Sequence, residues 1–173
     1  MIGFLRVIGL FNAALWLGAT IFFTFLAGPA FFSDEMKHFI PPPYNGVAAQ
    51  IVISRYFLLQ NACAAVALLH LAAGWIYFGR RTHRFMPGLL ATLLLLGLGG
   101  GYWLQPHLKH LHAVKYFGRT AAERADAAHA FGFWHGLSQM GNLLVLTGLL
   151  YYFWVLTWPE KSAAGGIRTK LRG

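Results

Sequence analysis

Four polar side chains interrupt the last long apolar stretch of the sequence at helical spacing. They stand at i, i+3, i+4 and i+7, and they are His135, Ser138, Gln139 and Asn142. Residues at these spacings share one face of a helix. Imidazole, hydroxyl and amide groups can hydrogen-bond a solute, and imidazole can also ligate a metal ion or haem iron. The spacing therefore predicts a polar face on this helix.

A second polar face is expected on the apolar stretch that begins near residue 54. Small and polar residues recur there at alternating steps of four and three: Tyr56, Gln60, Cys63, Ala67, His70, Gly74 and Tyr77. The first apolar stretch repeats the pattern at Gly9, Asn12, Trp16 and Ala19. In hydrocarbon, polar side chains are stable where they face other helices and find partners. Three such faces predict a packed antiparallel bundle.

Two interpretations of these polar faces stay open at the level of the sequence. In the first, the side chains only join the helices, through hydrogen bonds of about 0.6 kcal/mol each. In the second, they form a polar site in the outer half of the bundle, within about 17 Å of its outer surface at 1.5 Å per residue. The residues of that site are His135, Ser138, Gln139, Asn142, Gln60 and Asn61.

Further histidines and acidic residues cluster between the third and fourth apolar stretches. If the chain turns back at Gly118, antiparallel pairing sets His110 near Asp126 and His107 near His129. Imidazole and carboxylate are ligands for zinc, copper or another transition metal. Amphipathic packing of these histidines is the simpler alternative, because the segment has no two-cysteine motif and no H-E-x-x-H motif.

A haem site would need two histidines at one depth. His70 and His135 differ in depth by roughly 18 Å at 1.5 Å per residue, which excludes that pair. Haem bound by His135 and His107 stays open as an alternative.

The elements that must position these residues are long apolar helices. Of the 173 residues, 57% are apolar and 11% are charged, whereas soluble domains carry about 25% charged residues. Since about 20 apolar residues cross the hydrocarbon core of a bilayer, we expect an all-α, integral membrane four-helix bundle. Its expected spans are residues 4–28, 54–78, 85–104 and 131–158, followed by a flexible basic tail at 159–173.

Two connections carry helix signals of their own. Residues 30–53 are expected to be a loop with a short helix capped by Ser33, ended by three prolines and followed by a turn at Asn45-Gly46. Thr120 and Glu123 have the spacing of a capping box, so the fourth helix should begin near Ala121. Helix three should continue past Pro106 with a kink. These signals predict a helical hairpin that projects from the membrane.

The basic residues predict the orientation and the partners. The side with both termini and the 79–84 loop carries eight Lys and Arg, and the other side carries six. The positive-inside rule therefore places both termini in the cytoplasm. The net charge of +9 sits at the ends of the apolar stretches, so the expected partners are the lipid bilayer and partner membrane subunits rather than nucleic acid.

Two motifs resemble a known family. The first runs Leu15-Trp16-Leu17-Gly18 and ends at Gly28-Pro29; the second comprises Gln105-Pro106-His107 and the H-G-x-S-x-x-x-N pattern from His135 to Asn142. Together they are similar to the four-span family of transmembrane protein 205 and its bacterial relatives with a domain of unknown function. This resemblance implies a four-helix integral membrane protein and singles out seven residues: Trp16, Gly18, Pro29, Pro106, His135, Ser138 and Asn142. We expect its location to be the bacterial inner (plasma) membrane.

A more distant resemblance in layout concerns copper-resistance membrane proteins and haem-dependent protoporphyrinogen oxidases. Those oxidases carry a histidine in the first span, and this sequence has none there. The sequence also contains no ordered Ser-His-acid arrangement, phosphate-binding glycine loop or dinucleotide motif. We therefore expect a non-enzymatic protein that handles a small solute or metal, or an accessory subunit of a membrane complex. A haem- or metal-dependent redox protein that uses the outer histidines, and a purely structural subunit, are the alternatives.

Overall fold

The computed structural model describes residues 2–78 and 85–157. The expected basic tail (159–173) and the 79–84 loop, which dominates the orientation argument, lie outside these residues. Within them every regular element is helical, which confirms the all-α prediction. The elements are α1 (Ile2–Phe22), η1 (Phe23–Ala27), α2 (Gly28–Ala30), α3 (Asp34–Phe39), α4 (Tyr44–Phe78), α5 (Phe85–Gly99), η2 (Gly100–Leu104), α6 (Gln105–Phe117) and α7 (Ala121–Thr157), where η marks π-helical segments.

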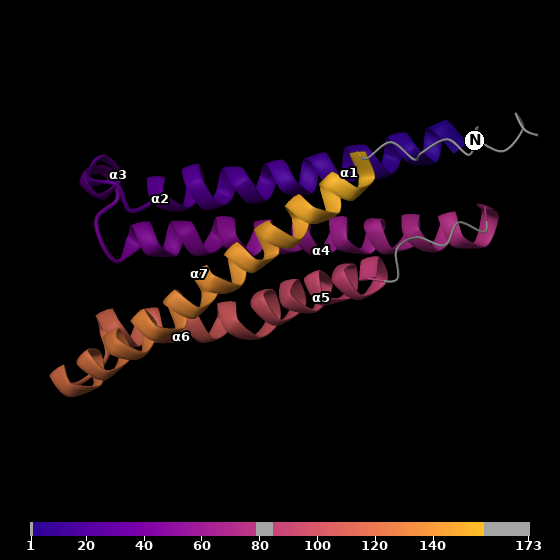
Figure 1. Ribbon diagram of the computed structural model, residues 1–173. Coiled ribbons are helices and arrows are strands. Elements are labelled where there is room, and N and C mark those ends of the chain that lie inside the picture. Colours follow the sequence, from indigo (N-terminus) through magenta and orange to yellow (C-terminus); the bar gives the residue numbers. More distant parts are fainter. Residues whose placement is uncertain (1, 79–84, 158–173) are drawn as a thin grey trace, which may run out of the picture.

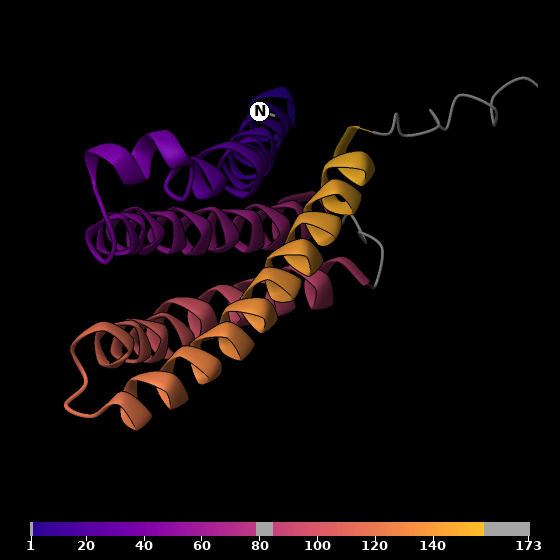
Figure 2. The ribbon, with the colours of Figure 1, turned by 90° about the vertical axis from the view of Figure 1, so that its left-hand side faces the viewer.

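Four continuous helical runs are long and apolar enough to cross a membrane: Phe4–Ala30, Tyr44–Tyr77, Phe85–Phe117 and Ala121–Thr157. The four apolar helices indicate an integral membrane protein. α4 packs between α1 and α5, and α6 and α7 form a helical hairpin (Figure 1). α7 then crosses the bundle diagonally and packs against α1 near its own end (Figure 2).

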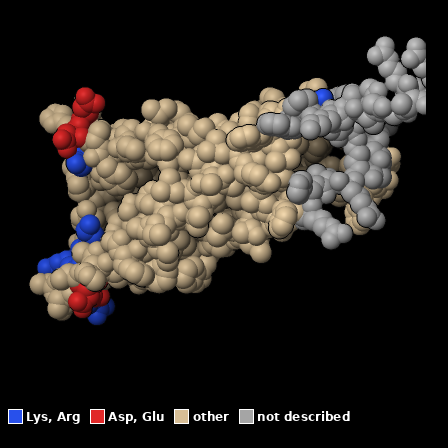
Figure 3. Space-filling model, viewed as in Figure 1, with Lys and Arg blue, Asp and Glu red and all other residues tan. Residues whose placement is uncertain are grey.

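The charged side chains mark two ends of the molecule. We call "hairpin end" the one that holds α2, α3, the start of α4 and the α6–α7 connection, and "opposite end" the one where α1 begins and α7 ends. On the face in Figure 3, acidic and basic residues gather at the hairpin end, a basic residue lies at the opposite end, and the band between them is uncharged. This distribution suits a lipid-facing belt between two polar surfaces.

The tightly packed core lies toward the opposite end. Its members come from residues 13–17, 63–67, 86–93 and 145–152. Trp16, Leu90 and Leu149 are almost completely buried there, and the Asn12 side chain donates a 2.9 Å hydrogen bond to the Cys63 carbonyl. A Cβ atom at Gly9 would lie 2.5 Å from the His70 ring. Small residues thus let α1 and α4 approach closely, as the sequence pattern predicted.

Both π-helical segments begin six residues before a proline: Phe23 before Pro29 and Gly100 before Pro106. A proline inside a helix has no N–H, and its ring clashes with the carbonyl four residues earlier. Widening the preceding turn to π geometry relieves that clash and lets the helix continue. The first helix therefore runs on through Ala30, whereas the sequence led us to expect an end at Pro29.

The connection between the first two long helices differs from its prediction. Ser33 caps α3 as expected, by accepting a 3.2 Å hydrogen bond from the Met36 N–H. However, α4 begins at Tyr44, ten residues before the expected start, and the predicted Asn45-Gly46 turn is part of its first turn. Tertiary contacts explain the difference, because the buried Asn45 amide donates to the Phe31 carbonyl at 3.2 Å.

The start of α7 agrees with the sequence signal. The Glu123 N–H donates to the Thr120 hydroxyl at 3.1 Å, and the Glu123 carboxylate accepts from the Arg119 N–H at 2.8 Å. The carboxylate thus reaches one residue further back than in the usual capping box. α7 begins at Ala121, as predicted.

The close approach of α4 and α5 yields a stability prediction. A Cβ atom at the buried Gly97 would collide with the Asn61 side-chain oxygen and lie 3.0 Å from Gln60 Nε2, whereas a Cβ at Gly99 would meet nothing within 4 Å. Gly97→Ala should therefore destabilise the fold by about 1–3 kcal/mol, the usual range for overpacking. Gly99→Ala should not. Apparent Tm values in detergent at one scan rate test this, and equal values for both variants would contradict the packing described.

Candidate functional site

A cavity of about 1040 Å³ lies toward the hairpin end, beyond the tightly packed core. Its lining comes from η1, α2, α3, α4, α5, η2, α6 and α7 and from the turns that flank α3. Small-molecule sites in proteins usually enclose about 300–1,000 Å³, so this cavity is at the large end of that range. Five of the six polar residues singled out by sequence spacing line it: Gln60, His135, Ser138, Gln139 and Asn142.

A hydrogen-bonded network at Asn142 ties three helices together beside the cavity. The Asn142 amide donates to the Thr24 hydroxyl at 2.7 Å, and its oxygen accepts from the Tyr56 hydroxyl at 3.4 Å. Tyr56 also lies 3.3 Å from the Thr20 hydroxyl. Tyr56 stacks on Phe23, with ring centroids 4.6 Å apart. The network lies on the cavity wall, where the α1–η1 run, α4 and α7 meet, and the lining continues past it to the core residue Val145.

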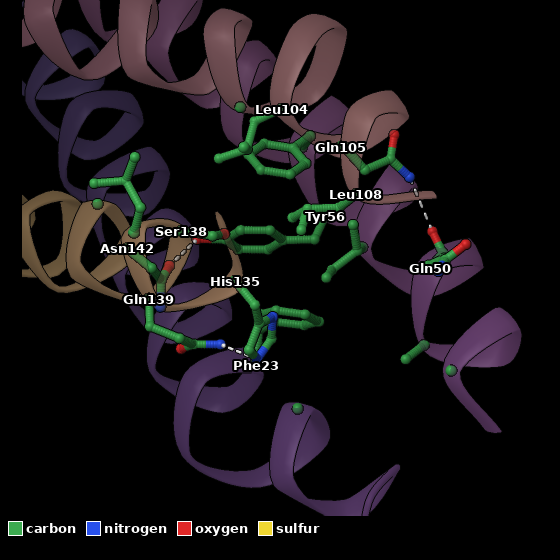
Figure 4. A pocket seen from close by; sticks show the side chains of 18 of the residues that line it. Phe23, Gln50, Tyr56, Leu104, Gln105, Leu108, His135, Ser138, Gln139 and Asn142 are labelled. Carbon is green, nitrogen blue, oxygen red and sulfur yellow. Dashed lines mark hydrogen bonds between the residues drawn. The ribbon is translucent and has the colours of Figure 1, made fainter. Parts of the chain in front are cut away.

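His135 and Gln139 form a second polar pair on the α7 wall. Their side chains lie 3.5 Å apart, from Gln139 Nε2 to His135 Nε2 (Figure 4). The His135 ring stacks on Phe131 at 5.6 Å between centroids. Aromatic stacking covers one face of the imidazole and the Gln139 contact lies at its Nε2, so the ring is held in place on the cavity wall.

Two lining residues keep unused hydrogen-bonding groups. Gln60 is only 3% exposed, yet among the described residues no hydrogen bond involves its side chain, and the same is true of the Ser138 hydroxyl. Buried polar groups normally have partners, so the Gln60 amide is available to a bound molecule or to water, and the half-buried Ser138 hydroxyl is available as well. Asn61, the sixth predicted residue, does not line the cavity; its side-chain oxygen lies against Gly97, buried and without a partner.

On the side of the cavity formed by α4 and α6, side chains of α6 contact α4 directly. The Gln105 amide donates to the Gln50 carbonyl at 3.2 Å (Figure 4) and also to the Ser54 hydroxyl. Further along, the buried His112 ring packs directly on Gly46, at a position where a Cβ atom would collide with it. Glycine at position 46 therefore permits the α4–α6 contact that the expected turn at this site would have prevented.

Two lysines are the charged residues of the described lining. Lys37 comes from α3 and Lys115 from the last turn of α6. The Lys37 ammonium lies 3.0 Å from the fully exposed Asp34 carboxylate. The Lys115 ammonium lies 5.5 Å from the centroid of the Phe131 ring, which in turn stacks on His135.

The histidine–carboxylate group predicted on the hairpin is not assembled as a metal site. Within residues 2–78 and 85–157, no three His, Cys, Asp or Glu side chains lie close enough to hold one ion. His110, Asp126 and His129 are exposed, whereas His112 and Ala127 occupy the buried faces of the hairpin. The sequence gives the antiparallel pairing but not the rotation of each helix, and that rotation turns these three side chains outward.

His107 and His135 belong to different surroundings. His107 stacks on Trp103 at 6.1 Å and meets the edge of Trp134 at 5.3 Å. Trp134 and His135 are consecutive on a helix, so their side chains point about 100° apart. His135 lines the cavity and His107 is not part of its described lining.

Sequence spacing missed several residues that shape the cavity. Thr20 and Thr24 follow Trp16 at steps of four, so helical phase could have identified them. Tyr56 belonged to the polar face of the second stretch but was not assigned to the site. Lys37 and Lys115 carry no such signal, since only the folding of α3 and of the hairpin brings them to one cavity.

The Thr24–Asn142 bond can be measured with a double-mutant cycle. Thr24→Val, Asn142→Leu and the double variant should show a coupling of about 0.6–1.7 kcal/mol in SDS unfolding, the range found for hydrogen bonds between membrane helices. Thr147→Val is the matched control on α7, because its hydroxyl bonds only to the Leu143 carbonyl of the same helix. Additive effects of Thr24→Val and Asn142→Leu would show that this bond does not hold the helices.

Comparison with known proteins gives the family of the chain. The sequence model of a family described as a domain of unknown function, DUF4149, matches residues 11–116. No curated protein and no solved structure matches the chain. The matched residues run from α1 through α6 and include Lys37, Tyr56, Gln60 and Lys115. Because they make up more than half of the 173 residues, the chain belongs to the DUF4149 family.

Proposed function

We propose that this protein is a non-enzymatic membrane protein that binds a small solute in the cavity at its hairpin end. One observation carries the proposal: Gln60, Ser138 and His135 present polar groups from two helices into a cavity of about 1040 Å³. Ligand sites are typically concave, mainly apolar and furnished with a few well-placed polar groups. The finer resemblance to transmembrane protein 205 relatives and a bacterial inner-membrane location are parts of this proposal.

The irregular helix geometry supports the same location. η1 and η2 both contribute lining residues, among them Phe23, Thr24 and Leu104. π-helical turns inside α-helices are frequent at functional sites. Here both π-helical segments lie beside the cavity, η1 in the first long helical run and η2 in the third.

The aromatic residues support a position for the bilayer. Trp134 and Trp154 are 20 residues apart on α7, which is about 30 Å of helix and equals the hydrocarbon thickness. Exposed Trp75 and Tyr77 would accompany Trp154 at one interface, and exposed Tyr102 and Trp103 would accompany Trp134 at the other. Such aromatic belts mark the two membrane surfaces. The cavity would then straddle the second interface, with both termini cytoplasmic and the hairpin end outside.

Cavity filling tests this function without knowledge of the solute. Native mass spectrometry of the detergent-purified protein should detect a bound small molecule on the wild type. Ser138→Trp should remove most of it, since the indole would occupy the cavity. Thr147→Trp makes the same change at an exposed position of the same helix and should retain the bound molecule. Identical adducts in Ser138→Trp and the wild type would contradict binding in this cavity.

The contribution of His135 can be tested in the same experiment. His135→Ala should weaken retention by about 2- to 10-fold, the equivalent of one hydrogen bond. His129→Ala, an exposed histidine on α7, is the control. Both variants should keep wild-type helicity by circular dichroism. Equal losses in the two variants would argue against a specific role for the cavity histidine.

A further inference from the structure

We infer that the cavity accepts an amphiphile that has an anionic end group and an extended apolar body. The inference rests on the proposed function and names the class of its ligand. The end group would lie between Lys37 and Lys115, and the apolar body would extend toward the core between α5 and α7.

The charges of the cavity lining favour an anionic end group. The charged lining residues that the structure describes are Lys37 and Lys115, and none of that lining is a carboxylate. The acidic neighbour of Lys37 is Asp34, whose side chain is fully exposed. An exposed pair of this kind contributes about 0–1 kcal/mol, so a ligand anion can replace it. A cationic end group would meet two like charges, and an anionic one would meet two opposite charges.

Away from the two lysines, the lining residues of the cavity change in chemical character. Lys115 lies over Phe131, Phe131 stacks on His135, and His135 contacts Gln139. Beyond these, the lining becomes aliphatic at Leu95, Leu96, Leu144 and Val145. The cavity therefore changes from cationic through aromatic and polar to apolar along one path. An amphiphile has the same sequence of chemistry along its length, whereas a small hydrophilic solute would leave the aliphatic part empty.

Size and access agree with such a ligand. About 1040 Å³ is far more than an ion or a single water requires, since one water takes up about 30 Å³ in the liquid. α7 packs on α1 near the opposite end and diverges from it toward the hairpin end (Figures 1 and 2). Lining residues come from both sides of this divergence, from Phe23 and Pro29 on one side and Leu137 and Met140 on the other. An amphiphile could thus enter from the adjacent lipid leaflet.

Binding of three defined probes tests the inference. The protein would be placed in nanodiscs of zwitterionic phosphatidylcholine, and native mass spectrometry would measure its affinity for oleate, for oleyl alcohol and for phosphatidylglycerol. Oleate and oleyl alcohol share one chain and differ in charge. We expect oleate or phosphatidylglycerol to bind at least about tenfold more tightly than oleyl alcohol, as for a charge-assisted hydrogen bond. Preference for oleate would identify a free amphiphile, and preference for phosphatidylglycerol would identify a lipid headgroup.

Lysine variants separate a specific site from general surface charge. Lys37→Gln and Lys115→Gln should each weaken binding of the anionic probe by about 5- to 10-fold and leave oleyl alcohol unchanged. Lys109→Gln is the matched control, because Lys109 is an exposed lysine of the same helix as Lys115 and not part of the described lining. Lys115→Arg should retain the preference for the anion.

The outcomes distinguish this inference from the proposed function. Equal binding of oleate and oleyl alcohol, both lost in Ser138→Trp, would overturn the anionic end group while the solute cavity stands. An equal loss in Lys109→Gln and Lys115→Gln would overturn it as well, since the attraction would then be non-specific. If no probe binds and the wild type also retains no small molecule on purification, the proposed function itself fails.

Discussion

The structure depends on the requirement that polar side chains on apolar helices find their partners inside the bundle. Water cannot satisfy them in hydrocarbon, so a bond to their own helix or to a neighbouring one stabilises them. Thr20 bonds to its own helix at the Trp16 carbonyl. Asn12 reaches α4, and Asn142 reaches η1, the continuation of α1. These bonds fix how α1, α4 and α7 are rotated about their axes, and that rotation decides which residues face the cavity.

The sizes of the packed residues and the two helix prolines explain why the bundle is tight at one end and hollow at the other. Toward the opposite end, glycine and alanine let the helices approach, and large side chains such as Trp16 and Leu149 fill the remaining space. Toward the hairpin end, Pro29 and Pro106 force π-helical turns, and α7 leaves α1 to pair with α6. The cavity lies where close packing gives way, and the Asn142 network that is shared by three helices lies on its wall.

Apolar length was sufficient to predict the fold class, the capping box predicted the start of α7, and helical phase singled out polar residues of which Gln60, His135, Ser138, Gln139 and Asn142 line the cavity. The sequence-based prediction failed where a local preference competed with a tertiary contact. Asn45-Gly46 favours a turn in isolation, but the Asn45–Phe31 bond and the close contact of Gly46 with His112 make it the first turn of α4. It also failed for the hairpin histidines, because sequence spacing gives no absolute rotation of one helix against another.

The unpaired amide of Gln60 gives the strongest physical reason to regard the cavity as a binding site. A buried polar group without a partner costs about 1–3 kcal/mol, and an aliphatic residue of similar size at this position would avoid that cost. The core residues one and two turns further along the same face, Ala64 and Ala67, are both apolar. From Ala67 and Ala64 to Gln60 this face therefore changes from apolar to polar, at the point where α4 meets the cavity. A polar group retained there is stabilised when the cavity is occupied by water or by a ligand atom that can hydrogen-bond, and this links the packing of α4 to the occupancy of the site.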